Sequence, residues 1–291
     1  MTEKPNWVPT GLDTSVANPA RVYDYLLGGG HNFEADRKLA HRIERELLPH
    51  ARDLVRLSRG FLRRALLFMI ENGVRQFLDL GSGIPTVGNV HQIAQQADPR
   101  CRVVYVDHEP IAVAHSELML QGNDRAAAVL GDLLDPEDIL GRPEVRRLLD
   151  LDQPVGLLTL MVWHFIPDSA KPGEVLRRYR QVLAPGSCLA ISHLTNDQGD
   201  ESLRRTITEY HAETNQNAYA RSHAEIVAMF DGFELVEPGV VGCAAWRPQG
   251  VGDFSDDPTT NLLVYGGVGR KPRVPAPPRT PRWRRLLRRR R

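Results

Sequence analysis

The feature that most constrains the fold of this 291-residue chain is an alternation of short apolar runs with helix-like segments. Between residues 75 and 265 the apolar runs are four to eight residues long, and helix start signals lie between them. Strands that alternate with helices in this way form a doubly wound, mostly parallel α/β sheet with helices on both faces. We expect seven strands, at residues 75–80, 102–106, 126–130, 155–162, 187–192, 233–236 and 261–265.

Helical segments are also predicted before the first strand. Asn18 and Pro19 mark a helix start, because Asn caps helices and Pro favours their first position. Two further helices are expected over residues 34–47 and 51–72, outside the strand–helix alternation. The expected organisation is a flexible arm (1–13), an N-terminal helical lid (14–73), a sheet domain (74–269) and a basic disordered tail (270–291).

The net charge of +1 hides an asymmetry between the body and the tail. The segment from Arg270 to Arg291 has 11 basic and no acidic residues, which leaves 26 basic against 36 acidic residues before it, a net charge of −10. No specific nucleic-acid partner is expected, because such binding needs positive charge facing the phosphates. The tail is interpreted as a solvated segment; the alternative is weak contact with an anionic surface.

The compartment is predicted from what the chain lacks. No apolar run is long enough to span a membrane, and residues 1–9 have no apolar signal-peptide core. The cysteines Cys101, Cys188 and Cys243 lie far apart, without the spacing of a zinc site or a disulfide framework. We therefore expect a cytoplasmic protein without a metal site.

The strongest local motif is a strand that runs into a glycine turn. Residues 76–83 read Gln-Phe-Leu-Asp-Leu-Gly-Ser-Gly, and a helical segment follows. In a doubly wound sheet this turn faces the crevice at the carboxyl ends of the strands, where Gly81 and Gly83 let the backbone approach a ligand. The N-terminus of the following helix is expected to favour a negative group. A plain tight turn is the alternative.

Two further strand ends carry carboxylates. Asp107 lies 24 residues beyond Gly83 and can accept hydrogen bonds from both hydroxyls of a ribose. Asp132 follows the third expected strand and can accept from an adenine amino group. Each is alternatively a helix cap. With the glycine turn they predict an adenosine site, and the dinucleotide fingerprint is weakened because Thr86 stands where its third glycine belongs.

These motifs, in this order, resemble those of class I S-adenosylmethionine-dependent methyltransferases. A closer resemblance is to an actinobacterial methyltransferase family long catalogued as a domain of unknown function. It covers nearly the whole chain except the tail, and it rests on residues 19–29 (Pro-Ala-Arg-Val-Tyr-Asp-Tyr-Leu-Leu-Gly-Gly), 31–37, 76–86, 104–107 and 164–168. The resemblance implies a Rossmann-like methyltransferase fold with S-adenosylmethionine as the cofactor.

The resemblance also implies the cofactor contacts. It places the methionine part of the cofactor near Asp79, Gly81 and Gly83, the ribose on Asp107 and the adenine near Asp132. The segment 23–32 would close over the cofactor. The further contact candidates are Tyr25, Gly28, Asn32 and Asp36, and the alternative is a packed lid without cofactor contact.

Methyl transfer from a sulfonium needs no metal and no covalent enzyme intermediate, so alignment of the reactants supplies most of the acceleration. A hydroxyl acceptor also needs its proton removed, which a histidine can do near neutral pH. His164 and His193 each follow an expected strand end and are the predicted catalytic residues, with structural roles as the alternatives. His31, in the glycine-rich segment, is a third possibility.

The predicted function is methyl transfer from S-adenosylmethionine to a small-molecule acceptor, at oxygen or nitrogen, with the acceptor and the oligomeric state left open. One alternative is an NAD-dependent oxidoreductase, although no tyrosine has a lysine four residues on. Another is a cofactor-binding regulator without catalysis. A nucleic-acid acceptor is disfavoured, because residues 162–167 read Val-Trp-His-Phe-Ile-Pro in place of the Asn/Asp-Pro-Pro motif that often holds a flipped base.

Overall fold

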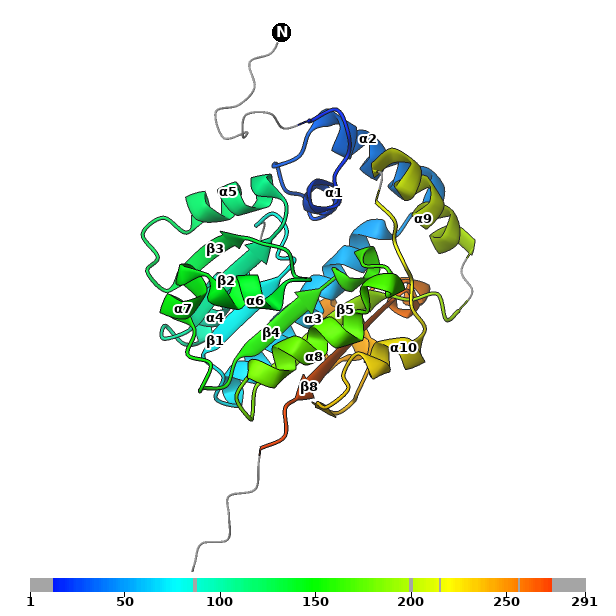
Figure 1. The fold of residues 1–291 in the computed structure, drawn as a ribbon. Helices are drawn as coiled ribbons and strands as arrows, with labels where there is room; N and C mark the ends of the chain where they lie inside the picture. Colours follow the sequence, from blue (N-terminus) through cyan, green and yellow to red (C-terminus); the bar gives the residue numbers. More distant parts are fainter. Residues whose placement is uncertain (1–12, 86–87, 199–200, 215, 256, 274–291) are drawn as a thin grey trace, which may run out of the picture.

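A computed structural model describes residues 13–85, 88–198, 201–214, 216–255 and 257–273 (Figure 1). Five parallel strands and an antiparallel edge form one sheet. Its order is β3 (Ala126–Leu130), β2 (Arg102–Asp107), β1 (Gln76–Leu80), β4 (Gly156–Leu160), β5 (Cys188–Leu194), β8 (Val264–Arg270) and β6 (Glu234–Leu235). This path has the seven expected strands, and a two-residue strand, β7 (Val241–Gly242), also pairs with β8.

The last long strand begins later than the sequence predicts. Residues Pro258–Leu262 form a 3-10 turn instead of a strand, because the Asp257 side chain caps the turn and accepts from the amide of Thr259. Strand β8 then runs through three glycines that carry no apolar side chain, so periodicity did not reveal it. The glycines are needed for packing: a Cβ on Gly267 would lie 2.9 Å from Val240.

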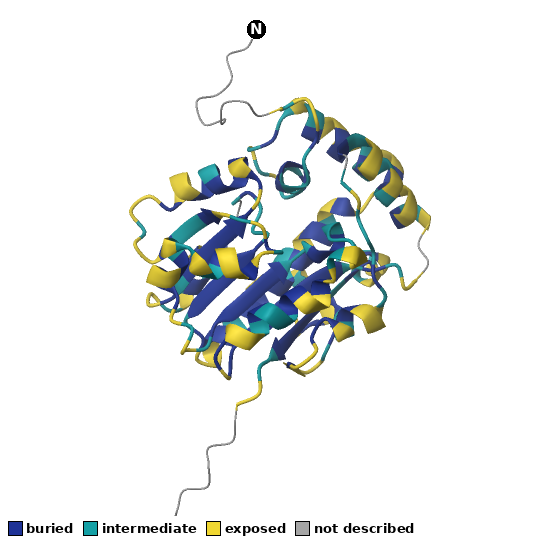
Figure 2. Ribbon diagram, in the orientation of Figure 1, coloured by how far each residue is buried: buried dark blue, intermediate teal, exposed yellow. Residues whose placement is uncertain are grey.

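The two faces of the sheet bury alternate residues of each strand. Phe77 and Leu158 face helices α3 (Ala51–Glu71) and α4 (Val90–Ala97), whereas Leu78 and Leu157 face the opposite layer. That layer contains α6 (Pro136–Gly141), α7 (Pro143–Leu148), α8 (Pro172–Val182) and α10 (His223–Ala228). Helix α5 (Pro110–Met119) contacts β2 and β3. Figure 2 shows that the central strands are buried, and burial on both faces explains why their sequences are almost continuously apolar.

Four helical elements lie at the carboxyl ends of the strands: α1 (Pro19–Leu26), α2 (Glu34–Arg42), the π-helical turn η1 (Ile43–Leu47) and α9 (Glu201–Thr214) (Figure 1). We call them the strand-end helices. Asn18 caps α1 as expected, with its side chain accepting from the amide of Ala20 at 2.9 Å. Arg42 pairs with Glu209 and Glu213, which joins α2 to α9 although about 170 residues separate them in the sequence.

Two expectations need adjustment. Helix α3, within the segment expected to form the lid, packs along the face of the sheet instead, where Phe61, Ala65 and Met69 are fully buried. Helix α4 begins at Val90, so its N-terminus does not directly follow the glycine turn, and the amide of His91 in its first turn donates to the Tyr105 hydroxyl at 2.8 Å. That amide is therefore not available to an anion.

Most of the arm and the tail, and position 86, lie outside the described residues. Within the part of the chain that the structure describes, no helix has the length and apolar character needed to cross a membrane. The same residues contain no cluster of three potential metal ligands.

Candidate active site

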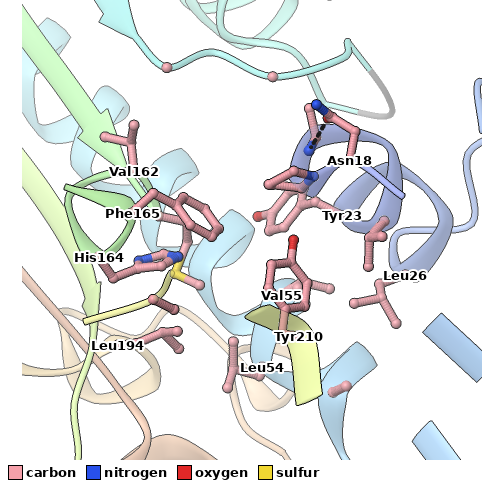
Figure 3. A pocket seen from close by; sticks show the side chains of 18 of the residues that line it. Asn18, Tyr23, Leu26, Leu54, Val55, Val162, His164, Phe165, Leu194 and Tyr210 are labelled. Atoms are coloured by element: carbon pink, nitrogen blue, oxygen red, sulfur yellow. Dashed lines mark hydrogen bonds between the residues drawn. The ribbon is translucent and has the colours of Figure 1, made fainter. Parts of the chain in front are cut away.

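A cavity of about 180 Å³ lies between the carboxyl ends of β1, β2, β4 and β5 and the helices α1, α3 and α9 (Figure 3). A single water molecule needs roughly 10–15 Å³ of such space, so the cavity is large enough for a ligand of many atoms. Of the sequence-predicted site residues, the structure places four in its wall: Gly81, Gly83, Asp107 and His164.

The glycine turn after β1 requires both of its glycines. Gly81 and Gly83 have φ angles of +68° and +66°, a region that side chains make costly. A Cβ on Gly81 would lie 2.4 Å from Cγ2 of Val162, whereas a Cβ on Gly83 would meet nothing within 4 Å. Gly81 therefore allows close packing inside the wall, and Gly83 leaves open space where a ligand can approach the backbone.

Asp107 is held rigidly beside this turn. Its Oδ2 accepts from the amide of Gly83 at 2.7 Å, and its Oδ1 accepts from the amide of Glu109 at 2.9 Å. A carboxylate oxygen has two acceptor positions, so each oxygen retains one for a ligand hydroxyl. The oriented carboxylate and the open space at Gly83 fit the ribose and neighbouring atoms of S-adenosylmethionine.

Glu109 adds a second carboxylate that the sequence analysis missed. Its side chain lines the cavity and the residue is only 9% exposed. Its Oε2 accepts from Nδ2 of Asn18 at 2.8 Å, and its Oε1, 3.9 Å from Arg21, has no hydrogen-bond partner within the described residues. Burial raises the pKa of this carboxyl. The sequence did contain a signal for Glu109. Proline favours the first position of a helix, so Pro110 places Glu109 at the start of α5, beside the strand end.

His164 lies in the cavity wall, on the 3-10 turn Trp163–Phe165 that follows β4. It is 2% exposed, and its Nδ1 has no hydrogen-bond partner within the described part of the chain. Burial, with His193 and the charge of Arg221 nearby, lowers its pKa well below the usual value. The imidazole is therefore neutral at physiological pH.

His193 lies behind this ring, outside the cavity wall, with the two ring centroids 5.7 Å apart. Its Nδ1 is 2.6 Å from the carbonyl oxygen of Leu194, and its Nε2 is 2.8 Å from Arg221. Because the guanidinium can only donate, Nε2 accepts and the ring proton lies on Nδ1. Burial lowers the pKa of His193 to about 4. Both ring nitrogens of His193 therefore have partners, whereas Nδ1 of His164 has none among the described residues.

The backbone between β4 and His164 is strained. Met161 has a φ of 52°, an uncommon conformation for a residue other than glycine. Its amide donates to the carbonyl oxygen and to Oγ of Ser192, at 2.9 and 3.1 Å. This turn ends β4 earlier than the apolar run predicts and directs the following residues into the cavity.

The two carboxylates predicted to contact the cofactor from β1 and from the end of β3 lie outside the wall. Asp79, on β1, is buried behind it, and its pKa is raised to about 7 by burial and by Asp107, against the opposing charge of Arg59. Asp132 is exposed, and its Oδ1 accepts from the amide of Leu134 at 2.9 Å.

The candidates from the N-terminal segment make contacts within and between the helical elements there. Asp36 is fully buried and accepts from Arg21, Asn18 and Phe33. The side-chain amide of Asn32 donates to Asp24 and to the carbonyl of Gly29. The Tyr25 hydroxyl is 3.0 Å from His41, and Gly28 has a φ of +82° at the end of α1. The ring of His31 lies against that of His115, with centroids 4.0 Å apart and planes tilted by 50°. None of the five candidates, Tyr25, Gly28, His31, Asn32 and Asp36, is among the described residues of the wall.

The wall facing the strand ends contains two tyrosines that the sequence analysis missed. Tyr23 comes from α1 and Tyr210 from α9, and their hydroxyl groups point toward each other in the cavity (Figure 3). The Tyr210 ring stacks on Phe165 with centroids 6.2 Å apart. Leu203, Ile207 and Tyr210 have the spacing of one helix face, which was a detectable signal for α9.

Comparisons with known proteins agree with this geometry. The sequence model of a family described as S-adenosyl methyltransferase matches residues 5–272. The structure of a candidate methyltransferase from Thermobifida fusca YX is 39% identical, with a TM-score of 0.84, covering 92% of this chain and all of that one. A DUF574-family protein from Streptomyces avermitilis MA-4680 is 38% identical, also with a TM-score of 0.84, covering 89% and 99%.

A curated relative is the carboxy-S-adenosyl-L-methionine synthase of Ectopseudomonas mendocina (strain ymp), 32% identical over 169 residues. The match covers 54% of this chain and 63% of that protein, so the chain spans less than two thirds of the relative's length. The family match includes the glycine turn, Asp107 and both histidines, and it favours a sulfonium cofactor over the dinucleotide alternative. The chain therefore belongs to the S-adenosyl methyltransferase family and is an enzyme that takes its methyl group from S-adenosylmethionine.

Proposed function

We propose that the protein transfers the methyl group of S-adenosylmethionine to a small molecule enclosed in the cavity beneath α1 and α9. The observation that carries this proposal is the continuity of the cavity. The glycine turn and Asp107 form one end of its wall, and apolar side chains of the strand-end helices form the other. A donor and an acceptor held in one enclosed space react as neighbours, which lowers the entropic part of the barrier.

The cofactor end is assigned to Gly81, Gly83 and Asp107, with Glu109 close by. Bound S-adenosylmethionine supplies an electrophilic methyl carbon on a positively charged sulfur. Asp79 is proposed to support the cofactor end from behind the wall, because it is buried on β1 just before the glycine turn. We also propose that Asp132 contacts the adenine. This contact requires its carboxylate to turn toward the cofactor end of the cavity.

We assign the acceptor's proton to His164. Its imidazole is neutral and lies in the wall, so it can accept a proton from an acceptor group during transfer. His193 is proposed as a positioning residue, because both of its nitrogens are engaged and Arg221 links it to the carbonyl of Trp163 in the turn that carries His164.

The strand-end helices are proposed to act as a lid, with Asn32 and Asp36 maintaining its shape. This divides the chain into a lid (α1, α2, η1 and α9) and the sheet domain that carries the cofactor end. The three cysteines are free thiols, which supports a reducing cytoplasmic location.

The test is calorimetric titration of the purified protein with S-adenosylmethionine, S-adenosylhomocysteine and NAD. Asp107→Asn removes a charged hydrogen-bond acceptor worth about 1.5–3 kcal/mol, so its affinity for both sulfur nucleotides should fall roughly 10- to 150-fold. The matched control is Asp152→Asn, an exposed carboxylate outside the cavity wall. Equal affinity of wild type and Asp107→Asn, or tight binding of NAD alone, contradicts the assignment.

A further inference from the structure

The acceptor end of the cavity is apolar. Side chains from three helices form it: Val22, Leu26, Leu54, Val55, Leu203 and Ile207. A ligand that occupies this end exchanges water for hydrocarbon surface, so its affinity comes from apolar area. Polar atoms of the ligand that reach these side chains would lose their hydrogen bonds.

Charged groups are confined to the other end. Asp107 is the last residue of β2, and His108 and Glu109 follow it. Among the described residues of the wall, those supplied by α1, α3 and α9 include no Asp, Glu, Lys, Arg or His. A carboxylate or an ammonium group on the acceptor would therefore be buried here without a counter-ion, which is strongly unfavourable.

Two tyrosine hydroxyls supply polar atoms at this end of the cavity. The hydroxyls of Tyr23 and Tyr210 point toward each other, and the ring of Phe165 and, beyond it, that of His164 lie on the strand side of the cavity (Figure 3). The third hydroxyl in this part of the wall, that of Thr206, already donates to the carbonyl of Ser202 at 2.8 Å.

Both tyrosines are held as neutral groups. Burial raises the pKa of Tyr23 and of Tyr210 above the usual value, so each keeps its proton at physiological pH. Tyr23 is fixed by a hydrogen bond with Ser58, whose Oγ lies 2.9 Å from Oγ of Ser192. The site thus offers hydroxyl groups that can donate to, or accept from, one uncharged polar group.

We propose that the methyl acceptor is a neutral aromatic molecule with a hydroxyl group, a phenol, whose ring fills the apolar end and whose oxygen lies between the two tyrosines and His164. This inference rests on the proposed function. In the reaction the phenol oxygen forms a bond to the methyl carbon while the carbon–sulfur bond breaks. The electron pair of that bond stays on sulfur as S-adenosylhomocysteine forms, and the phenol proton passes to the imidazole of His164.

Two features favour a phenol over an aliphatic alcohol. The stacked rings of Phe165 and Tyr210 offer a flat aromatic surface, on which an aromatic ligand packs well. His164 is a weak base in its buried position, so it needs a hydroxyl as acidic as a phenol, whose pKa is about 10.

The test measures binding of matched probes to the protein saturated with S-adenosylhomocysteine. The probes are phenol and 2-naphthol, the carboxylates and ammonium compounds with the same rings, and naphthalene. Ligand-detected NMR and calorimetry give the affinities without any turnover. We expect one of the two phenols to bind at least tenfold more tightly than its carboxylate and ammonium counterparts, and to become O-methylated when S-adenosylmethionine replaces the homocysteine product.

Variants locate the hydroxyl. Tyr23→Phe and Tyr210→Phe should each weaken binding of the phenol threefold or more and leave naphthalene binding unchanged. Tyr265→Phe, on β8 outside the wall, is the matched control and should change neither. Tighter binding of an ionic probe, or no binding of either phenol, overturns the inference while nucleotide binding still supports the proposed function. Absence of nucleotide binding overturns both.

Discussion

Replacing Gly81 or Gly83 by alanine separates two destabilising effects, backbone strain and steric overpacking, which usually occur together. Gly81→Ala and Gly83→Ala both force alanine to a φ near +67°, at about 1–2 kcal/mol each. Only Gly81→Ala also brings a methyl group within 2.4 Å of Cγ2 and 2.8 Å of Cβ of Val162, and overpacking of this kind costs about 1–3 kcal/mol more. The expected losses are therefore about 2–5 kcal/mol for Gly81→Ala and about 1–2 kcal/mol for Gly83→Ala.

The assay is equilibrium unfolding in urea without nucleotide, followed by circular dichroism. Replacing glycine also restricts the unfolded chain, but this effect is the same in both variants and cancels in the comparison. Calorimetry should show that Gly83→Ala, although the more stable of the two, binds S-adenosylmethionine more weakly than wild type, because its methyl group enters open cavity space. Equal stability of the two variants would refute the argument, since it would mean that Val162 moves aside at no cost.

Three further predictions concern buried ionisable side chains. Asp36→Ala leaves the guanidinium of Arg21 buried without its 2.9 Å partner, so we expect a loss of about 3–5 kcal/mol and faster proteolysis within α1 and α2; unchanged proteolysis would contradict this role. Asp79 has a pKa of about 7 in the fold against an ordinary value of 3.8, so the folded state holds a proton that the unfolded state has released between these values. Stability should therefore fall by about 3 kcal/mol as the pH rises from 4 to 7. Asp79→Asn should remove this slope and be more stable than wild type at pH 8 in urea unfolding; a slope that survives in the variant has another origin. Nitrogen-15 NMR should find His193 protonated at Nδ1 and not titrating above about pH 5, and titration near 6.5 would contradict its bond to Arg221.

The sequence alone determined the architecture, because the signals for it are local. A central strand buried on both faces must be continuously apolar, and a helix start needs a capping side chain, so the parallel strands and the cap at Asn18 agree with the structure. The glycine turn was also predictable, since positive φ angles and close packing both require glycine. The continuation of β8 to Arg270 was missed because its glycines carry no periodic apolar signal.

Only the tertiary structure decided which side chains meet. Tyr23 and Tyr210 lie 187 positions apart in the sequence and converge in one cavity once α1 and α9 pack over the strand ends. His164 and His193 look equivalent in sequence, but His164 follows β4 and lies in the cavity wall, whereas His193 lies within the neighbouring strand β5 and uses both nitrogens in fixed hydrogen bonds. Periodicity tells which residues share a face of one element, whereas a site depends on contacts between elements, and these contacts exist only after the chain has packed.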